Sequence, residues 1–264
     1  MQPLTIVSLL AENARPLHHA VARYLSEHAN LPARLVEGVP WQQQEHMLDT
    51  GAADVGFLCG LLYTQKTDHL APLAAPVMAA PRYAGMPIYF SDVVVPAGSP
   101  FGRFADLRGA RWLFNDPGSF SGYAVLRAHL AALGETGDFC GSMQASGGHI
   151  RPLEMVAAGE ADAAALDSTV LDLERARRPE LVARVRTVAA LGPHSIPPAA
   201  VARHVPPAVQ EQLRAALLGM HTTEAGRQTL TLGQVARFVA IRDIDYNDVR
   251  ATANTANQIV FRPQ

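Results

Sequence analysis

The stretch FNDPGSFSGYAVLRAHLAAL, residues 114–133, decides how this chain is interpreted. It begins where a short apolar run, ARWLFN at 110–115, ends, and it finishes in a segment with the composition of a helix, 121–133. The turn between them is rich in Asp, Pro, Gly and Ser, which are residues that stop strands and begin helices. A strand, a turn and a helix in this order are typical of α/β proteins with parallel strands.

The same alternation runs through most of the chain. The predicted strands cover 4–9, 33–38, 53–58, 110–115, 139–145, 162–168 and 183–190. The predicted helices cover 16–28, 41–49, 121–133, 149–158, 168–177, 207–219, 222–231 and 246–257. We therefore expect an α/β protein.

Two breaks in the alternation, near 92–97 and 191–200, predict two lobes joined by hinge strands. If the chain leaves the first lobe at one break and returns at the other, the second lobe is an insertion. Lobe 1 is then predicted to consist of residues 1–93 plus 197–264, and lobe 2 of residues 94–196.

Composition excludes several classes of protein. The chain has 264 residues, of which 48% are hydrophobic and 17% charged, and a formal net charge of -2, as in an ordinary globular protein. It has no run rich in Lys and Arg, which argues against a nucleic-acid partner or a membrane-surface protein. Its two cysteines, Cys59 and Cys140, have no metal-ligand spacing, and we expect neither a metal nor a cofactor.

The start of the chain, MQPLTIVSLLAENARP, does not resemble a secretory leader. It lacks a basic start, a long apolar centre and a cleavage site of small residues. Two expectations for the location follow. The protein is cytoplasmic, or it is periplasmic and a leader has been removed and replaced by Met.

Two successive turns between a strand and a helix carry donors for a negatively charged ligand. The first contains Ser119, Ser121 and Gly122, and the second contains the sequence Ser-Gly-Gly-His at 146–149, ahead of a helix that has Pro152 in its first turn. In a doubly wound sheet, such turns line one edge, where ligands bind to the free N–H groups of the following helix. Hydroxyls, amides and an imidazole could then hold an oxyanion without Lys or Arg. The competing interpretation is that these residues only cap their helices.

The sequence resembles the substrate-binding proteins of ABC transporters for phosphonate, phosphite and phosphate. These proteins are of the PhnD type within the type II periplasmic-binding fold. The segments that carry the resemblance are EGVPWQQQEHMLDTGAADVGFLCGLLY (37–63), PIYFSDVVV (87–95), FADLRGARWLFNDPGSFSGY (104–123), SGGHIRPLEMVAAGEADAAALDS (146–168) and FVAIRDIDYNDVRATA (238–253).

The resemblance implies a two-lobed fold, each lobe a mostly parallel sheet flanked by helices, with the ligand cleft between the lobes. It implies a monomer that binds a small phosphonate-like anion and, if exported, hands it to the permease of an ABC transporter. The ligand-binding residues that it implies in the second lobe are Ser119, Phe120, Ser121, Gly122, Tyr123, His149 and Asp167, with Asp167 facing a substituent of the ligand. Those that it implies in the first lobe are Trp41, Gly60, Tyr63 and Tyr89.

The sequence departs from the family pattern in two places. Phe120 stands where phosphonate binders commonly carry Thr, and the first-lobe loop contains Trp41, Cys59 and Gly60, a variant associated with a divergent branch. These departures leave a larger, partly apolar anion as an alternative ligand.

Several residues also have a simpler structural interpretation. Trp41 could pack on a sheet, Tyr63 and Tyr89 could be half-buried surface aromatics, and Asp167 could cap the helix that starts at Ser168.

Two other functions compete with ligand transport. An enzyme on the same scaffold would use His149 and Asp167 as acid and base, although no Ser–His–Asp order or metal cluster accompanies them. The effector domain of a transcription regulator would need DNA-binding helices that the sequence lacks. We therefore expect a binding protein and not an enzyme.

Overall fold

The computed structural model describes residues 2–261, which form two compact units. Of the described residues, the first unit contains 2–10, 14–88 and 195–247, and the second contains 11–13, 89–194 and 248–261. Residues 11–13, 89–93 and 248–261, which the sequence predicted in lobe 1, belong to the second compact unit, and residues 195 and 196, predicted in lobe 2, belong to the first.

The first unit is built on a six-stranded mixed sheet with the order β11-β4-β10-β3-β1-β2. Its strands are β1 (Leu4–Ser8), β2 (Ala33–Leu35), β3 (Val55–Phe57), β4 (Leu70–Met78), β10 (Ala199–Ala202) and β11 (Val235–Val239). β1 pairs in parallel with β2 and β3, while β10 and β11 run antiparallel to their neighbours. All five residues of β1 are buried, which fits a strand covered on both faces.

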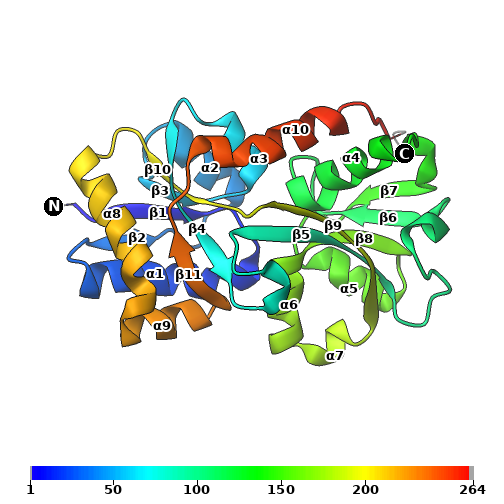
Figure 1. The fold of residues 1–264 in the computed structure, drawn as a ribbon, viewed down its shortest axis with the longest axis horizontal. Helices are drawn as coiled ribbons and strands as arrows, with labels where there is room; N and C mark the ends of the chain where they lie inside the picture. The colour runs from blue at the N-terminus through cyan, green and yellow to red at the C-terminus, as the bar shows by residue number, and fades with distance from the viewer. Residues whose placement is uncertain (1, 262–264) are drawn as a thin grey trace. The chain divides into compact units, whose positions relative to one another are not determined.

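Helices cover both faces of the first sheet (Figure 1). They are α1 (Arg15–His28), α2 (Trp41–Asp49), α3 (Gly60–Gln65), α8 (Pro207–Gly219) and α9 (Glu224–Thr231). On the α2 side, the buried Gln44 side chain accepts a hydrogen bond from the Ser8 N–H at 3.0 Å, which ties α2 to the end of β1.

The second unit contains a five-stranded sheet with the order β7-β6-β8-β5-β9. Its strands are β5 (Ile88–Pro96), β6 (Arg111–Phe114), β7 (Ser142–Ala145), β8 (Ala163–Asp167) and β9 (Val185–Ser195). β6 pairs in parallel with β7 and with β8, and β5 runs antiparallel to β8 with Ser91 opposite Asp167.

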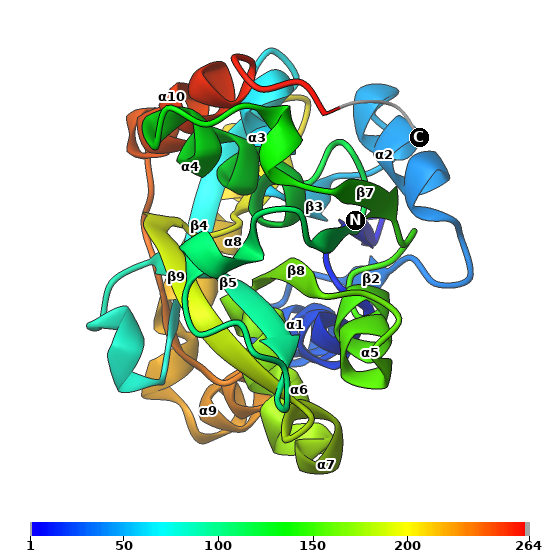
Figure 2. The ribbon, with the colours of Figure 1, turned by 90° about the vertical axis from the view of Figure 1, so that its right-hand side faces the viewer.

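Helices of the second unit lie on both sides of its sheet (Figure 2). They are α4 (Val125–Ala132), α5 (Arg151–Ala158), α6 (Ser168–Arg177), α7 (Pro179–Val182) and α10 (Asn247–Ala256), whose first residue belongs to the first unit. On one side, α5, α6 and α7 enclose a core that includes Leu113, Leu153, Val156, Leu166 and Leu171. On the other side, Trp112 packs near Phe104, and Phe114 packs against Tyr123 at the start of α4.

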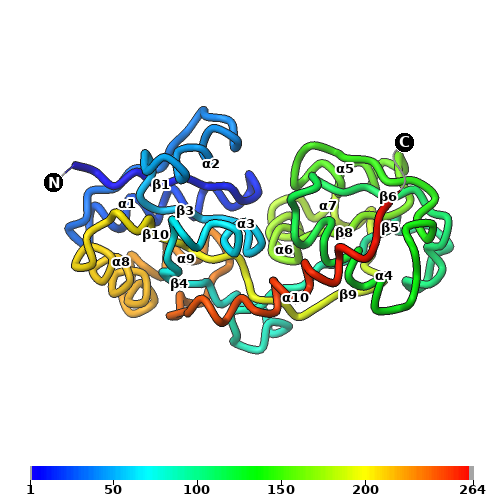
Figure 3. Tube along the Cα trace, turned by 90° about the horizontal axis from the view of Figure 1, so that it is seen from above, coloured from blue at the N-terminus to red at the C-terminus, as the bar shows by residue number. Residues whose placement is uncertain are grey.

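The C-terminal segment lies beside α4 (Figure 3). The Arg127 guanidinium donates two hydrogen bonds to the carbonyl of Ile259, at 2.9 and 2.6 Å. A Cβ on Gly137 would stand 2.0 Å from the Val260 carbonyl oxygen, so this backbone approaches closely. These contacts explain why the segment belongs to the second unit, a relationship that periodicity does not reveal.

Most predicted elements form, with shifted ends. The helix predicted at 121–133 begins as a π-helical turn, Phe120–Ala124, and continues as α4. Strands β4, β10 and β11 were not among the predicted strands. Within residues 2–261, no helix has both the length and the apolar character needed to cross a membrane.

Candidate functional site

The candidate site lies where β6, β7 and β8 of the second unit end. These three strands are parallel, so their carboxyl ends meet at one edge of the sheet. The chain continues from β6 into the turn at 115–119, from β7 into the turn at 146–150, and from β8 directly into α6. Both turns that the sequence predicted to carry anion donors therefore lie at the same edge.

In the first turn, Ser119 caps the following helix. Its hydroxyl oxygen accepts a hydrogen bond from the Gly122 N–H at 3.1 Å, and the side chain is buried. The predicted alternative role of Ser119, helix capping, is therefore present. The first N–H groups of a helix have no intrahelical acceptor, so those of Phe120 and Ser121 remain available to a ligand.

Ser121 is one of the residues that line a small cavity. Its carbonyl accepts a 2.6 Å hydrogen bond from the hydroxyl of Ser91, a buried residue of β5. Its own hydroxyl has no hydrogen-bond partner within the part of the chain that the structure describes. The bond from Ser91 therefore fixes the backbone of Ser121, and the Ser121 hydroxyl can donate a hydrogen bond to a ligand.

In the second turn, Ser146 shapes the loop and His149 faces the cavity. The Ser146 hydroxyl lies 3.1 Å from the Phe114 carbonyl and 3.3 Å from that of Gly148, so it is used within the turn. The Nδ1 atom of His149 lies 3.2 Å from Nδ2 of Asn115, the residue that follows β6. Asn115 therefore links the two turns.

Asp167 ends β8 and caps α6. Its Oδ1 accepts hydrogen bonds from the N–H and from the hydroxyl of Thr169, both at 2.7 Å. Burial raises the pKa of the Asp167 carboxyl, although the bonds from Thr169 and the nearby His149 act in the opposite direction. The predicted capping role is present, and Asp167 also lines the small cavity described next.

The cavity between these groups has a volume of about 10 Å³, which is room for roughly one water molecule. It is lined by Asn115, Ser121, Gly122, His149, Pro152, Ala165, Leu166, Asp167 and Val170. No Lys or Arg is among these lining residues. The polar groups that face it are a hydroxyl, an amide, an imidazole and one carboxyl.

Two predicted residues of the same turn point elsewhere. The Phe120 ring is fully buried and meets the His194 ring edge-on, with 5.1 Å between the ring centroids. The Tyr123 ring packs against Phe114 at 4.6 Å, and the guanidinium of Arg127 lies 5.1 Å from its centroid. Neither side chain lines the cavity.

The remaining predicted residues are mostly in the first unit. Tyr63 is fully buried, and its hydroxyl donates to Asp243 Oδ1 at 2.9 Å. Gly60 begins α3 and is buried, whereas Trp41 begins α2 and is 48% exposed, so it is not a core residue. Tyr89 is buried, and it belongs to the second unit rather than to the first.

Asn115 and Ser91 were not predicted from the sequence as site residues. Asn115 is only 6% exposed, and a Cβ on Gly122 would stand 2.2 Å from its Oδ1, so the side chain lies directly over that glycine. A signal for Asn115 was present, since a polar residue directly after a buried strand lies at the ligand-binding edge. Ser91 gave no such signal, because it lies on β5, which comes before the strands β6, β7 and β8 whose ends form the site.

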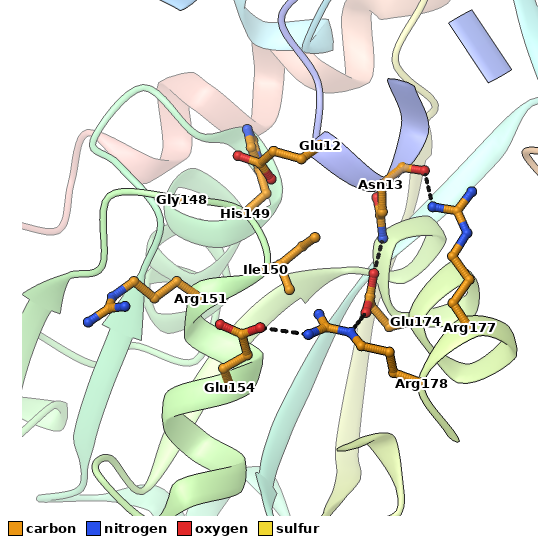
Figure 4. Close-up of a pocket in the computed structure, with 10 residues that line it drawn as sticks. All are labelled: Glu12, Asn13, Gly148, His149, Ile150, Arg151, Glu154, Glu174, Arg177 and Arg178. Atoms are coloured by element: carbon orange, nitrogen blue, oxygen red, sulfur yellow. Dashed lines mark hydrogen bonds and ion pairs between the residues drawn. The ribbon is translucent and has the colours of Figure 1, made fainter. Parts of the chain in front are cut away.

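A larger hollow, of about 510 Å³, is also lined by His149 (Figure 4). Several of its charged groups pair: Arg178 donates to Glu174 and Glu154 at 2.5 and 2.7 Å. Asn13 donates to Glu174 and receives a hydrogen bond from Arg177 on its carbonyl. The small cavity is kept as the candidate site because residues of both predicted donor turns, Ser121 and His149, line it.

The described residues contain no cluster of three or more His, Cys, Asp or Glu side chains that could hold a metal ion. Cys140 is buried, and burial raises the pKa of its thiol to about 12, so the thiol remains protonated.

Comparison with protein families gives one match, over residues 8–246, to the family described as "ABC transporter, phosphonate, periplasmic substrate-binding protein". No curated protein matches the sequence.

Several solved structures share the fold. A binding protein component of an ABC phosphonate transporter from Pseudomonas aeruginosa has a TM-score of 0.84 at 15% identity, over 97% of this chain and 87% of that chain. PhnD1 from Prochlorococcus marinus, solved in complex with methylphosphonate, has a TM-score of 0.84 at 16% identity, over 98% and 99%. A Xanthomonas citri protein bound to chloride ion has a TM-score of 0.75 at 16% identity, over 97% and 98%. The α/β fold predicted from the sequence, that of two-lobed periplasmic binding proteins, is confirmed.

Proposed function

The chain belongs to the family of periplasmic substrate-binding proteins of phosphonate ABC transporters, and we propose that its ligand is a phosphonate or a closely related small oxyanion, such as phosphite or phosphate. The family consists of solute-binding proteins, so the chain is not an enzyme, and the alternative in which His149 and Asp167 act as acid and base is not favoured. We also propose that the protein works in the periplasm and passes its ligand to a permease.

The observation that carries the proposal is the convergence of uncharged donors at one edge of the second sheet. Ser121 and His149, from two different turns, line the same cavity. The N–H groups at the start of the helix beginning at Phe120 add partial positive charge there, and so does the start of α5. An oxyanion with several acceptor oxygens matches this set of donors.

Asp167 is the one acidic group that lines the cavity. A fully ionised carboxylate would repel an anion, and the raised pKa of Asp167 reduces the cost of keeping this group neutral. We propose that Asp167 faces the part of the ligand that carries least negative charge, namely a protonated oxygen or the organic substituent. The turn donors would then face the charged oxygens.

The position of Phe120 supports a small ligand. The sequence left a larger, partly apolar anion open because an aromatic ring replaces a hydroxyl at this position. That ring is fully buried against His194 and does not line the cavity. It therefore adds no apolar surface to the site.

The capture of the ligand between two lobes, with Tyr63 as a contact from the first lobe, stays a prediction. The Tyr63 hydroxyl already donates to Asp243.

Isothermal titration calorimetry with methylphosphonate, phosphite and phosphate tests the proposal. We expect at least one of them to bind, and Ser121→Ala and His149→Ala each to weaken binding about tenfold or more, because each removes a donor from a desolvated charge. Ser99→Ala is the matched control, because this buried hydroxyl of the second unit has no hydrogen-bond partner among residues 2–261 and Ser99 does not line the cavity. Absence of binding, or equal affinity in all three variants, would contradict the proposal.

A further inference from the structure

The side chain of Asn115 has only one orientation that satisfies its neighbours. Its Nδ2 lies 3.4 Å from Asp116 Oδ2 and 3.2 Å from His149 Nδ1. An ionised carboxylate only accepts hydrogen bonds, so the atom that faces Asp116 must be the amide nitrogen. Exchanging the nitrogen and oxygen of the amide would place two acceptors opposite each other.

The rest of the second unit holds Asn115 in place. The side chain is buried, and its Oδ1 occupies the space that a side chain on residue 122 would need. Asp116 is itself fixed, since its Oδ1 accepts a 2.7 Å hydrogen bond from the Gly118 N–H. The direction in which Nδ2 donates is therefore set by the turn.

The orientation of Asn115 determines which ring nitrogen of His149 carries the proton. Because Nδ2 is a donor, Nδ1 of His149 must accept, and a neutral ring then carries its hydrogen on Nε2. Nε2 has no hydrogen-bond partner among residues 2–261. His149 lines the small cavity together with Ser121.

We propose that Asn115 is a positioning residue that holds His149 in the Nε2–H tautomer, so that the ring donates a hydrogen bond to the bound anion. This inference rests on the proposed function, since it describes how one donor of that site is prepared. The chain Asp116, Asn115, His149 transmits the orientation from an exposed turn to the cavity. A ring protonated on Nδ1 would face the amide donor and could not be held there.

The test is a long-range ¹⁵N–¹H correlation spectrum of the histidine rings in the uniformly labelled, ligand-free protein near neutral pH. The His149 signals are assigned by their loss in His149→Gln. We expect Nδ1 to show the shift of an unprotonated ring nitrogen and Nε2 that of a protonated one. A protonated Nδ1 in the unmodified protein would overturn the inference, and this result needs no variant to fold.

Asn115→Asp supplies the second arm. A carboxylate in this place accepts instead of donating, so we expect Nδ1 of His149 to become protonated and the affinity for methylphosphonate to fall about tenfold or more. Asn254→Asp is the control, because it adds the same charge at an exposed position of α10 in the same unit and should leave the His149 signals unchanged. An unchanged His149 tautomer in folded Asn115→Asp would also overturn the inference.

The two proposals fail in different ways. If methylphosphonate, phosphite and phosphate all fail to bind while His149 shows the expected tautomer, the proposed ligand class is wrong and the positioning role stands. If the ligand binds while Nδ1 is protonated in the unmodified protein, the positioning role is wrong and the ligand class stands.

Discussion

The amide oxygen of Asn115 lies where a side chain on residue 122 would have to begin, because a Cβ built on Gly122 would stand 2.2 Å from Oδ1. The same position would be 3.0 Å from the Ser119 hydroxyl oxygen, which caps the turn. The glycine is therefore required for close approach, and Asn115, Ser119 and Gly122 pack tightly within the first turn.

We expect Gly122→Ala to displace Asn115 and to lower the free energy of unfolding by about 1–3 kcal/mol, the usual cost of overpacking a filled site. It should also weaken binding of methylphosphonate, since the group that orients His149 has moved. Urea denaturation and calorimetry measure the two effects. The control is Gly219→Ala: this glycine has helical angles and open space around it, so the change should be neutral or stabilising by about 0.5–1 kcal/mol. Equal stability of the two variants would contradict the account.

Because the Asp167 carboxyl has a raised pKa, we expect the free energy of unfolding to depend on pH. Burial raises the pKa of its carboxyl above the value in the unfolded chain, so the folded protein holds this proton more tightly. The contribution of Asp167 is therefore fully present below its ordinary pKa and is lost as the pH rises through the folded value. We expect Asp167→Asn, which is neutral at every pH, to gain stability relative to the unmodified protein as the pH is raised from 3 to 7.

The matched comparison for this prediction is Asp167→Ala. Both Asp and Asn can accept the hydrogen bonds from Thr169, whereas Ala removes the cap of α6. Loss of a cap costs about 0.5–2 kcal/mol. Ala should thus be less stable than Asn at every pH, and a stability difference between Asp and Asn that does not change with pH would refute the assignment.

Because His18 is buried, we expect acid to lower the stability of the first unit. Burial, with a smaller effect from Arg15, lowers the pKa of this imidazole to about 3, and the ring stacks on Phe57 with 4.0 Å between the centroids. Between its ordinary pKa of 6.5 and that value, the unfolded chain binds more protons than the folded one. The free energy of unfolding should therefore fall as the pH falls through this range, by a few kcal/mol at about 1.4 kcal/mol per pKa unit.

Urea midpoints at several pH values measure this effect in the unmodified protein and in His18→Gln, which should lose most of the slope. His19→Gln places the same substitution at an exposed position of α1, leaves His18 in place and should keep the slope. Identical slopes in all three proteins would show that His18 is not the cause.

We expect the hydroxyl of Tyr63 to stabilise the folded first unit. Because that hydroxyl donates to Asp243 at 2.9 Å within the first unit, Tyr63→Phe should lower the free energy of unfolding by about 1 kcal/mol. Thermal or urea unfolding checks this. The comparison is Tyr246→Phe, in which the lost hydroxyl donates to the Ile196 carbonyl at 2.9 Å and a similar loss is expected. An unchanged free energy of unfolding in Tyr63→Phe would show that this hydrogen bond does not stabilise the fold.

The sequence predicted the alternation of strands and helices, and with it the edge of the sheet at which Ser121, His149 and Asp167 gather. That part was accessible because turn residues and apolar periodicity are local, and because parallel strands place their carboxyl ends together. The family inferred by resemblance is confirmed by the match over residues 8–246.

Other features depend on contacts between distant segments. Phe120 and Tyr123 stand in the same turn as Ser121, yet Phe120 packs against His194 and Tyr123 against Phe114. The position of the last segment depends on Arg127 and Ile259, 132 residues apart. A local pattern cannot show which way a side chain of a turn points, and this is why Asn115 was missed while Phe120 and Tyr123 were included.

The crystal structure of the protein with bound methylphosphonate tests the central claim most directly. We predict that the phosphonate oxygens lie within hydrogen-bonding distance of Ser121 Oγ and His149 Nε2, with no Lys or Arg side chain in contact. A phosphonate held by an arginine, or bound away from the carboxyl ends of β6, β7 and β8, would contradict the account.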